Sequence, residues 1–146
     1  MMEFVKLTTK DAVLQTLLDF SDVFPHLGEK IDSMDAYAEK LSRFAQCWAG
    51  TEADAPVGLV IFYANDLNTR TAYISLIGVQ KAMQGKGVGQ RLMTHCAETA
   101  KALGMQQLSL EVDCDNLSAQ RFYQKNGFTF SGNTERNSMY LTKSLV

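Results

Sequence analysis

Apolar residues recur along this chain at two periods, and the period predicts whether a segment forms a helix or a strand. Where they lie three or four positions apart, they predict an amphipathic helix. A first helix begins at a Thr8 or Thr9 cap and ends near Phe20, and a second begins after a Ser33 cap. Two further helices are predicted, from the glycine-rich turn at 84–89 to about Leu103 and over 117–126.

Short apolar or alternating runs predict the strands. These runs cover residues 4–7, 57–63, 71–79 and 107–112, and a further strand is expected to begin within 45–49. Clusters of polar residues, glycine and proline predict a loop over 21–30, a polar turn over 50–56 and a hairpin turn over 65–68.

A strand, a glycine-rich turn, a helix and a second strand follow one another between residues 71 and 113. This order is typical of a βαβ unit, whose two strands lie parallel in one sheet. We therefore expect strands 71–79 and 107–113 to be parallel neighbours.

The composition is that of a globular protein, and we expect a single domain over residues 1–146. Hydrophobic residues make up 46% and charged residues 21%, which argues against disorder. The net charge of −2 and the lack of a basic run argue against a nucleic-acid partner. No apolar run approaches the roughly 18 residues of a membrane span, and the N-terminus lacks a signal-peptide core, so we expect a cytoplasmic protein.

The three cysteines, Cys47, Cys96 and Cys114, are odd in number and form no C-x-x-C pair. Reduced thiols are favoured over disulfides or a metal site, and no metal is expected.

The glycine-rich turn predicts a phosphate site. Gly85, Gly87 and Gly89 stand at alternate positions where a strand turns into a helix, so backbone N–H groups can approach a ligand closely. A dinucleotide loop is excluded, because Gln90 or Leu92 stands where G-x-G-x-x-G requires its third glycine. A Walker-type loop is excluded, because Gln90 stands where that pattern requires its second glycine. The pattern that remains is Q-x-x-G-x-G, which could by itself also be a tight structural turn.

A second segment makes the interpretation specific. Residues 110–128 read L-x-V-x-x-x-N-x-x-A-x-x-F-Y-x-x-x-G-F. Together with the upstream Q-x-x-G-x-G turn, this segment resembles the cofactor-binding region of the GCN5-related N-acetyltransferases (GNAT). The resemblance implies an α/β fold. Its central sheet would be mixed, mostly antiparallel, of six to seven strands with a parallel central pair, flanked by about four helices.

By the same resemblance, acetyl-CoA is the cosubstrate. The backbone of Ile77 and Val79 would pair with the pantetheine arm, the glycine turn would hold the pyrophosphate, and Asn116 would contact the pantetheine or nucleotide end. A helix N-cap is the alternative explanation for Asn116. The implied cofactor-binding residues are Ile77, Val79, Gln84, Gly85, Lys86, Gly87, Val88, Gly89, Asn116 and Tyr123.

For the chemistry, the resemblance implies that Tyr123 is the general acid for the departing thiolate. The backbone N–H of Ile77, at a bulge in its strand, would stabilise the oxyanion. The strand glutamate of many family members is missing here. Glu111 on the next strand is a candidate base, although a salt-bridged surface glutamate, a water wire or a free-amine substrate would also explain the sequence.

The resulting hypothesis is direct acetyl transfer from acetyl-CoA to a primary amine of a small molecule, such as an amino sugar or amino acid derivative. A non-catalytic acyl-CoA-binding or regulatory domain, and a protein N-terminal or lysine acetyltransferase, are the alternatives. The sequence leaves open whether the protein forms a homodimer. An aromatic acceptor pocket could be lined by Phe24, Tyr37, Phe62, Tyr63 and Tyr73, although core packing would also explain these residues.

Overall fold

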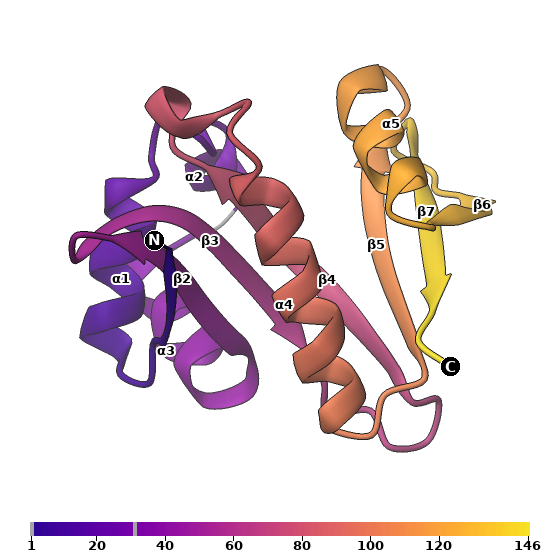
Figure 1. Cartoon of the computed structure of the whole chain (residues 1–146), viewed down its shortest axis with the longest axis horizontal. Helices are drawn as coiled ribbons and strands as arrows, with labels where there is room; N and C mark the ends of the chain where they lie inside the picture. The colour runs from indigo at the N-terminus through magenta and orange to yellow at the C-terminus, as the bar shows by residue number, and fades with distance from the viewer. Residues whose placement is uncertain (1, 31) are drawn as a thin grey trace.

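The computed structural model describes residues 2–30 and 32–146 and is built on one seven-stranded sheet in the order β1-β2-β3-β4-β5-β7-β6 (Figure 1). Its strands are β1 (Glu3–Lys6), β2 (Gln46–Glu52), β3 (Ala55–Tyr63), β4 (Thr71–Val79), β5 (Gln107–Asp113), β6 (Thr129–Asn133) and β7 (Ser138–Ser144). Its helices are α1 (Lys10–Asp19), α2 (Leu27–Lys30), α3 (Met34–Phe44), α4 (Val88–Ala102) and α5 (Leu117–Lys125), with a 3₁₀ turn at Lys81–Met83.

The sheet confirms the predicted fold class. Neighbouring strands are antiparallel except β4 and β5, which form the parallel central pair. The predicted caps Thr9, Ser33 and Asn116 each accept a backbone N–H three residues ahead, at 3.1, 3.2 and 3.1 Å.

The prediction of a polar turn over 50–56 is wrong. Strands β2 and β3 continue almost to each other and are joined at Ala53 and Asp54, whose φ angles are 49° and 65°. Gly50 and Pro56 suggested a longer turn, but Gly50 lies inside β2, where an added Cβ would stand 2.8 Å from the sulfur of Met2. The predicted loop over 21–30 also contains the short helix α2.

Two hydrophobic clusters pack on opposite faces of the sheet. Helices α1 and α3 cover one face of β2–β4 and bury Leu17, Phe20 and Leu41. Helix α4 covers the other face, and α5 packs on the same side through residues such as Tyr123. In the described part of the chain, no helix combines the length and apolar character needed to cross a membrane.

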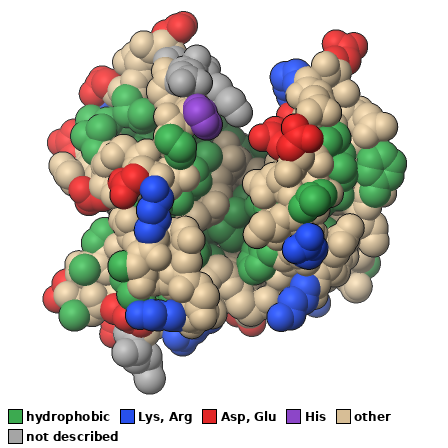
Figure 2. Space-filling view, turned by 90° about the horizontal axis from the view of Figure 1, so that it is seen from above, with side chains coloured by type: hydrophobic (Ala, Val, Ile, Leu, Met, Phe, Trp, Pro, Cys, Tyr) green, Lys and Arg blue, Asp and Glu red, His purple; other side chains and the backbone are tan. Residues whose placement is uncertain are grey.

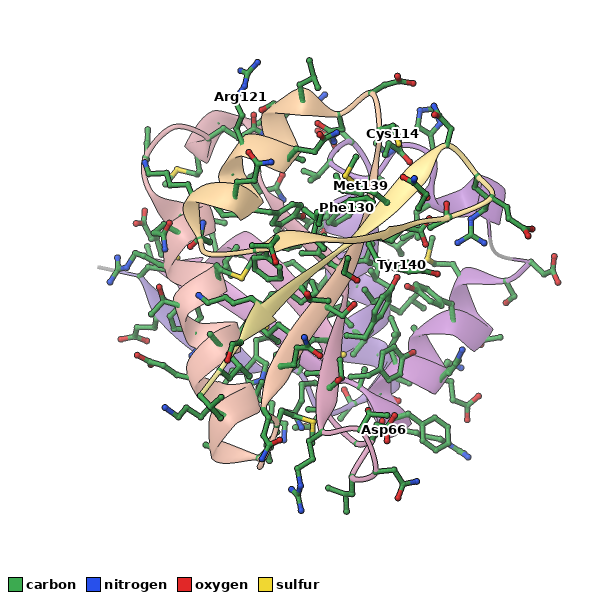
Figure 3. The ribbon with its side chains drawn as sticks, turned by 90° about the vertical axis from the view of Figure 1, so that its right-hand side faces the viewer. Asp66, Cys114, Arg121, Phe130, Met139 and Tyr140 are labelled. Carbon is green, nitrogen blue, oxygen red and sulfur yellow. The ribbon has the colours of Figure 1, made fainter. Side chains whose placement is uncertain are left out.

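Strands β4 and β5 separate soon after they meet. The parallel ladder joins Thr71–Tyr73 to Gln107–Ser109, and β5 then pairs only with β7 on its other side. The gap opens toward the end of the molecule that carries α5, opposite the β3–β4 turn that holds Asp66 (Figures 1 and 3). Seen from that end, the surface is hollowed between two lobes, with hydrophobic side chains in the hollow (Figure 2).

Close packing of α4 on β3 gives a test of the fold. A Cβ added at Gly58 would stand 2.7 Å from Leu92 Cδ1 and 2.9 Å from Val88 Cγ1. We expect Gly58→Ala to lower the free energy of unfolding by about 1–3 kcal/mol, because overpacking a buried contact forces neighbours to shift. Urea unfolding measures this value.

Gly132 in β6 is the matched control, since an added Cβ there meets no atom within 4 Å. A Gly58→Ala protein as stable as Gly132→Ala would contradict the packing of α4 on β3.

Candidate active site

A cavity of about 650 Å³ lies where β4 and β5 have separated, and it collects residues from both sequence motifs. It is lined by Ile77, Gly78, Val79, Met83, Gln84, Gly85, Gly87, Val88, Gly89, Gln90, Asn116, Ser118, Ala119, Phe122, Tyr123 and Lys125. Of the predicted cofactor-binding residues, all except Lys86 are among them. The fold therefore brings together, around one cavity, segments that lie more than 25 residues apart in sequence.

The cavity edge of β4 directs backbone groups away from β3 and into the gap. The N–H of Gln80 donates to Val57 O at 2.9 Å, so these two residues form a hydrogen-bonded antiparallel pair. Such pairs alternate with pairs whose N–H and C=O groups point away from the partner strand. In the observed register, Val79 opposite Gly58 and Ile77 opposite Val60 are of the second kind. Their backbone groups therefore point into the gap, as an added extended chain requires.

The glycine turn has the backbone geometry that glycine permits. Gly85 and Gly87 have φ angles of 79° and 83°, and an added Cβ at either would meet no protein atom within 4 Å. Gly87 caps α4, whose first internal hydrogen bond runs from the N–H of Arg91 to Gly87 O. The N–H groups before Arg91 are left without helical partners, so the helix N-terminus can bind an anion.

Gln84 holds the start of this turn against the strand. Its amide Nε2 donates to Val79 O at 3.2 Å. The side chain thus lies at the junction of β4 and the glycine turn, and the 3₁₀ turn at Lys81–Met83 spans the distance between them. Lys86, by contrast, is exposed and does not line the cavity.

Helix α5 forms the opposite wall. Asn116 is the N-cap, and the helix ends in a Schellman motif in which Phe128 N–H donates to Tyr123 O at 3.0 Å. Gly127, with φ of 92°, makes this ending possible. Because both ends are fixed, the face that bears Tyr123 is held toward the gap, whereas Arg121 points away from the sheet (Figure 3).

The Tyr123 ring is packed between aromatic neighbours. Its centroid lies 5.5 Å from that of Phe122 and 5.7 Å from that of Phe128, both in edge-to-face geometry. Burial raises the pKa of Tyr123 to about 12, because the phenolate is poorly solvated there. At neutral pH the hydroxyl therefore keeps its proton and can donate it, but cannot serve as a base.

One expectation about the geometry of β4 needs correction. The bulge in β4 is not at Ile77: Ile61 pairs with Leu76 and Phe62 with Ile74, which leaves Ser75 as the extra residue. No sequence signal marks that position. Ile77 follows the bulge and lines the cavity through the regular part of the strand.

Glu111 does not line the cavity either. Its Oε1 accepts a hydrogen bond from Arg136 Nη2 at 2.7 Å, and its Oε2 accepts one from the Ser138 hydroxyl. Both carboxylate oxygens of Glu111 are thus engaged by donors from residues 136–138. The salt-bridged glutamate named above as an alternative is therefore present, at the turn between β6 and β7, and a role of Glu111 as base stays a prediction.

Sequence reasoning missed several lining residues. Ser118, Phe122 and Lys125 extend the predicted face of α5 at helical spacing, so the motif itself contained the signal for them. Lys125 adds a positive charge to this wall. Met83 and Gln90 flank the glycine turn and are brought in by the backbone path.

The cysteines have no part in this site. Burial raises the pKa of Cys47 to about 11 and that of Cys96 to about 12, so neither thiol ionises at neutral pH. Among the described residues, no group of three or more histidine, cysteine and acidic side chains could hold a metal ion.

The five aromatic residues proposed for an acceptor pocket separate into two groups. Phe24 and Tyr37 line a second cavity, of about 350 Å³, on the α1–α3 face of the sheet. Phe62 is fully buried in the core, and Tyr63 and Tyr73 line neither cavity. For Phe62, packing is the correct explanation.

Comparison with known proteins agrees with this geometry. Residues 13–128 match the profile of the Acetyltransferase (GNAT) family. Over 76 residues, the chain is 33% identical to the "uncharacterized N-acetyltransferase YdgE" of Bacillus subtilis, covering 51% of this chain and 48% of that protein. Over 60 residues, it is 32% identical to "N-alpha-acetyltransferase 30" of Schizosaccharomyces pombe, covering 41% of this chain and 40% of that protein. The chain thus spans less than half the length of these curated relatives.

Among solved structures, the PaiA N-acetyltransferase of Thermoplasma acidophilum in complex with coenzyme A superposes with a TM-score of 0.77. The match covers 99% of both chains at 18% identity. At that identity, the likeness shows a shared fold.

Proposed function

Because this chain belongs to the Acetyltransferase (GNAT) family, we propose that it transfers an acetyl group from acetyl-CoA directly to a primary amine of a small molecule. The observation that supports this most strongly is the single cavity lined by the backbone edge of β4, the glycine turn and Tyr123. A backbone edge suits the amides of pantetheine, and a helix N-terminus suits a pyrophosphate.

Each wall of the cavity has a separate part in this proposal. The gap-facing backbone of Ile77 and Val79 binds the pantetheine amides, and the turn from Gln84 to Gly89 binds the pyrophosphate. The N–H of Ile77 lies near the reacting end, where a donor to the carbonyl oxygen lowers the barrier as negative charge develops. Asn116 and Lys125 complete the α5 side.

The proton balance follows from the protonated state of Tyr123. As the amine nitrogen bonds to the acetyl carbon and the carbon–sulfur bond breaks, the sulfur gains charge and Tyr123 donates to it. The proton that the amine loses leaves through solvent and replaces the one given to sulfur. Because the pKa of Tyr123 lies above the usual value for a thiol, about 8.5, hydrogen bonding to sulfur supplies much of the effect.

The 32% identity to an N-alpha-acetyltransferase supports a second candidate, in which the amine is the N-terminus of a protein. The donor cavity and Tyr123 would act identically in that case. The two differ in the acceptor, and comparing transfer to a short peptide N-terminus with transfer to small amines distinguishes them.

Binding of the donor is tested by thermal unfolding. A ligand that binds only the folded state stabilises it by about 2.7 kcal/mol at 100 times its Kd, which should raise Tm by roughly 5–10 °C. Gly89→Val should abolish the rise, because an added Cβ there points between Phe122, 3.5 Å away, and Val79, 3.8 Å away, both of which line the cavity. Gly87→Val should do the same, with added strain from its positive φ.

Gly132→Val on β6 is the control and should keep the full rise in Tm. CoA should stabilise the wild type as well as acetyl-CoA does, since the proposed contacts are to parts that both share. A folded Gly89→Val protein with an undiminished Tm rise would show that the glycine turn does not bind the donor.

The role of Tyr123 is tested by Tyr123→Phe, which removes the hydroxyl and keeps the ring. Loss of a general acid should lower the single-turnover rate about 10²–10⁴-fold, with KM for acetyl-CoA nearly unchanged. The wild-type rate should rise with pH as the amine loses its proton, without a fall below about pH 11 from ionisation of Tyr123, because its pKa is about 12.

Tyr63→Phe, outside both cavities, is the control and should keep the wild-type rate. A Tyr123→Phe protein with a full-speed chemical step would mean that this ring serves only packing.

A further inference from the structure

The bulge at Ser75 changes which face of the sheet the side chains of β4 point to, next to the reacting end of the donor cavity. Along a regular strand, side chains alternate between the two faces, but an extra residue breaks the alternation. Ser75 and Leu76 therefore both point toward the α1–α3 face, where Leu76 packs with the second hydrophobic cluster. The next residue, Ile77, packs on the opposite face and lines the donor cavity.

The second cavity begins at those two residues. It is formed by Ser75 and Leu76 of β4, by Tyr37 of α3 and by the segment 24–27, which enters α2. Its volume is about 350 Å³. Leu76 lines this cavity and Ile77 lines the donor cavity, so consecutive residues of β4 line the two cavities on opposite faces of the sheet, beside the place where the transfer is proposed to occur.

The walls of this second cavity are mainly apolar. Phe24, Pro25, Leu27 and Leu76 contribute hydrocarbon surface, and the ring of Tyr37 adds more. His26 contributes an imidazole to the same lining. An apolar cavity of this kind gains free energy from each methylene that it removes from water.

Besides His26, the cavity has a polar feature at the bulge itself. The hydroxyl-bearing side chains of Tyr37 and Ser75 both line the cavity here. The pKa of Tyr37 is raised, chiefly by burial, so its hydroxyl is neutral at physiological pH. A neutral hydroxyl oxygen can accept a hydrogen bond from an amine N–H, and this leaves the nitrogen lone pair available for attack.

The segment that closes the cavity is held on the strand. Phe24 and Val23 pack directly over Gly78, where an added Cβ would stand 2.6 Å from Phe24 Cζ and 2.7 Å from Val23 Cγ1. The backbone N–H of Phe24 donates to Phe20 O at 3.1 Å, and that of Leu27 donates to Phe24 O at 3.1 Å. Only glycine at position 78 leaves room for Phe24 and Val23 on the strand. This contact holds the segment that lines the cavity against β4, so the cavity is already formed in the folded chain.

We propose that this second cavity takes the apolar substituent of the amine acceptor, and that Ser75, with Tyr37, positions the amine nitrogen at the bulge. The proposal rests on the transferase function above and narrows its acceptor to primary amines borne on a hydrocarbon group. Ser75 and Tyr37 are positioning residues, and Leu27 and Leu76 determine specificity.

A ladder of straight-chain amines, from propylamine to heptylamine, tests the proposal. These amines have nearly equal basicity, so kcat/KM measured by CoA release at one pH compares the hydrocarbon chains alone. Each added CH₂ should raise kcat/KM about fourfold until the cavity is filled. Glucosamine, with a polar body, should be a poor acceptor.

Leu27→Asn puts an amide of similar size into the apolar wall. It should abolish the increase of kcat/KM with the chain length of the amine. Ser75→Ala should lower kcat/KM for every amine while leaving KM for acetyl-CoA unchanged, and Ser75→Thr should restore part of the loss. Ser109→Ala on β5, outside both cavities, is the control for Ser75→Ala. The Tm rise with acetyl-CoA shows that each variant is folded.

The outcomes separate this inference from the function on which it rests. Acetyl transfer that does not depend on chain length, or that prefers glucosamine, would overturn the acceptor assignment and leave the transferase function intact. A Leu27→Asn protein whose kcat/KM still rises with chain length as in the wild type would also overturn it. Acetyl-CoA binding without transfer to any amine would overturn both.

Discussion

The early separation of β4 from β5 is the structural constraint on which the rest of the site depends. Parallel strands normally satisfy each other's backbone groups along their length, and here the ladder ends after Tyr73 and Ser109. Beyond that point, β4 has β3 on one edge only, and β5 has β7 on one edge only. The edge of β4 that faces the gap directs the backbone N–H groups of Ile77 and Val79 away from β3. An extended amide-bearing ligand can pair with such a strand edge.

The elements around this gap hold it open. Helix α4 begins after its N-cap Gly87 and packs closely on β3 at Gly58, and α5 lies on the β5 side with both ends capped. The glycine turn therefore lies at the end of the free strand edge, so that an anion at the helix N-terminus and an extended chain along β4 can belong to one ligand. The bulge at Ser75 places a second, apolar cavity on the far face at the other end of that edge.

Sequence reasoning could predict the parts of this arrangement that depend on local chemistry. Glycines that need positive φ, caps such as Asn116, and the helical face that bears Tyr123 are all determined by residues close in sequence. The parts that it missed depend on distant partners. Glu111 is held by Arg136, 25 residues away, and Phe24 is seated on Gly78. The bulge at Ser75 arises from the register between β3 and β4. No residue type in β4 predicts that register. The glycine turn and the face of α5 were therefore predictable in detail, and of the second cavity only Phe24 and Tyr37 were.

The central claim is that the free edge of β4 pairs with the donor, and amide hydrogen exchange measures this directly. Ile77 and Val79 direct their N–H groups into the gap, whereas the register gives Gly78, between them, a hydrogen-bonded pairing with Leu59 of β3. Acetyl-CoA should slow exchange at Ile77 and Val79, by tenfold or more beyond any general stabilisation, because an N–H that gains a hydrogen bond must break it to exchange. Gly78, already protected, should show only the general change. Equal slowing at all three amides, or none at Ile77 and Val79 in the presence of bound acetyl-CoA, would contradict the claim.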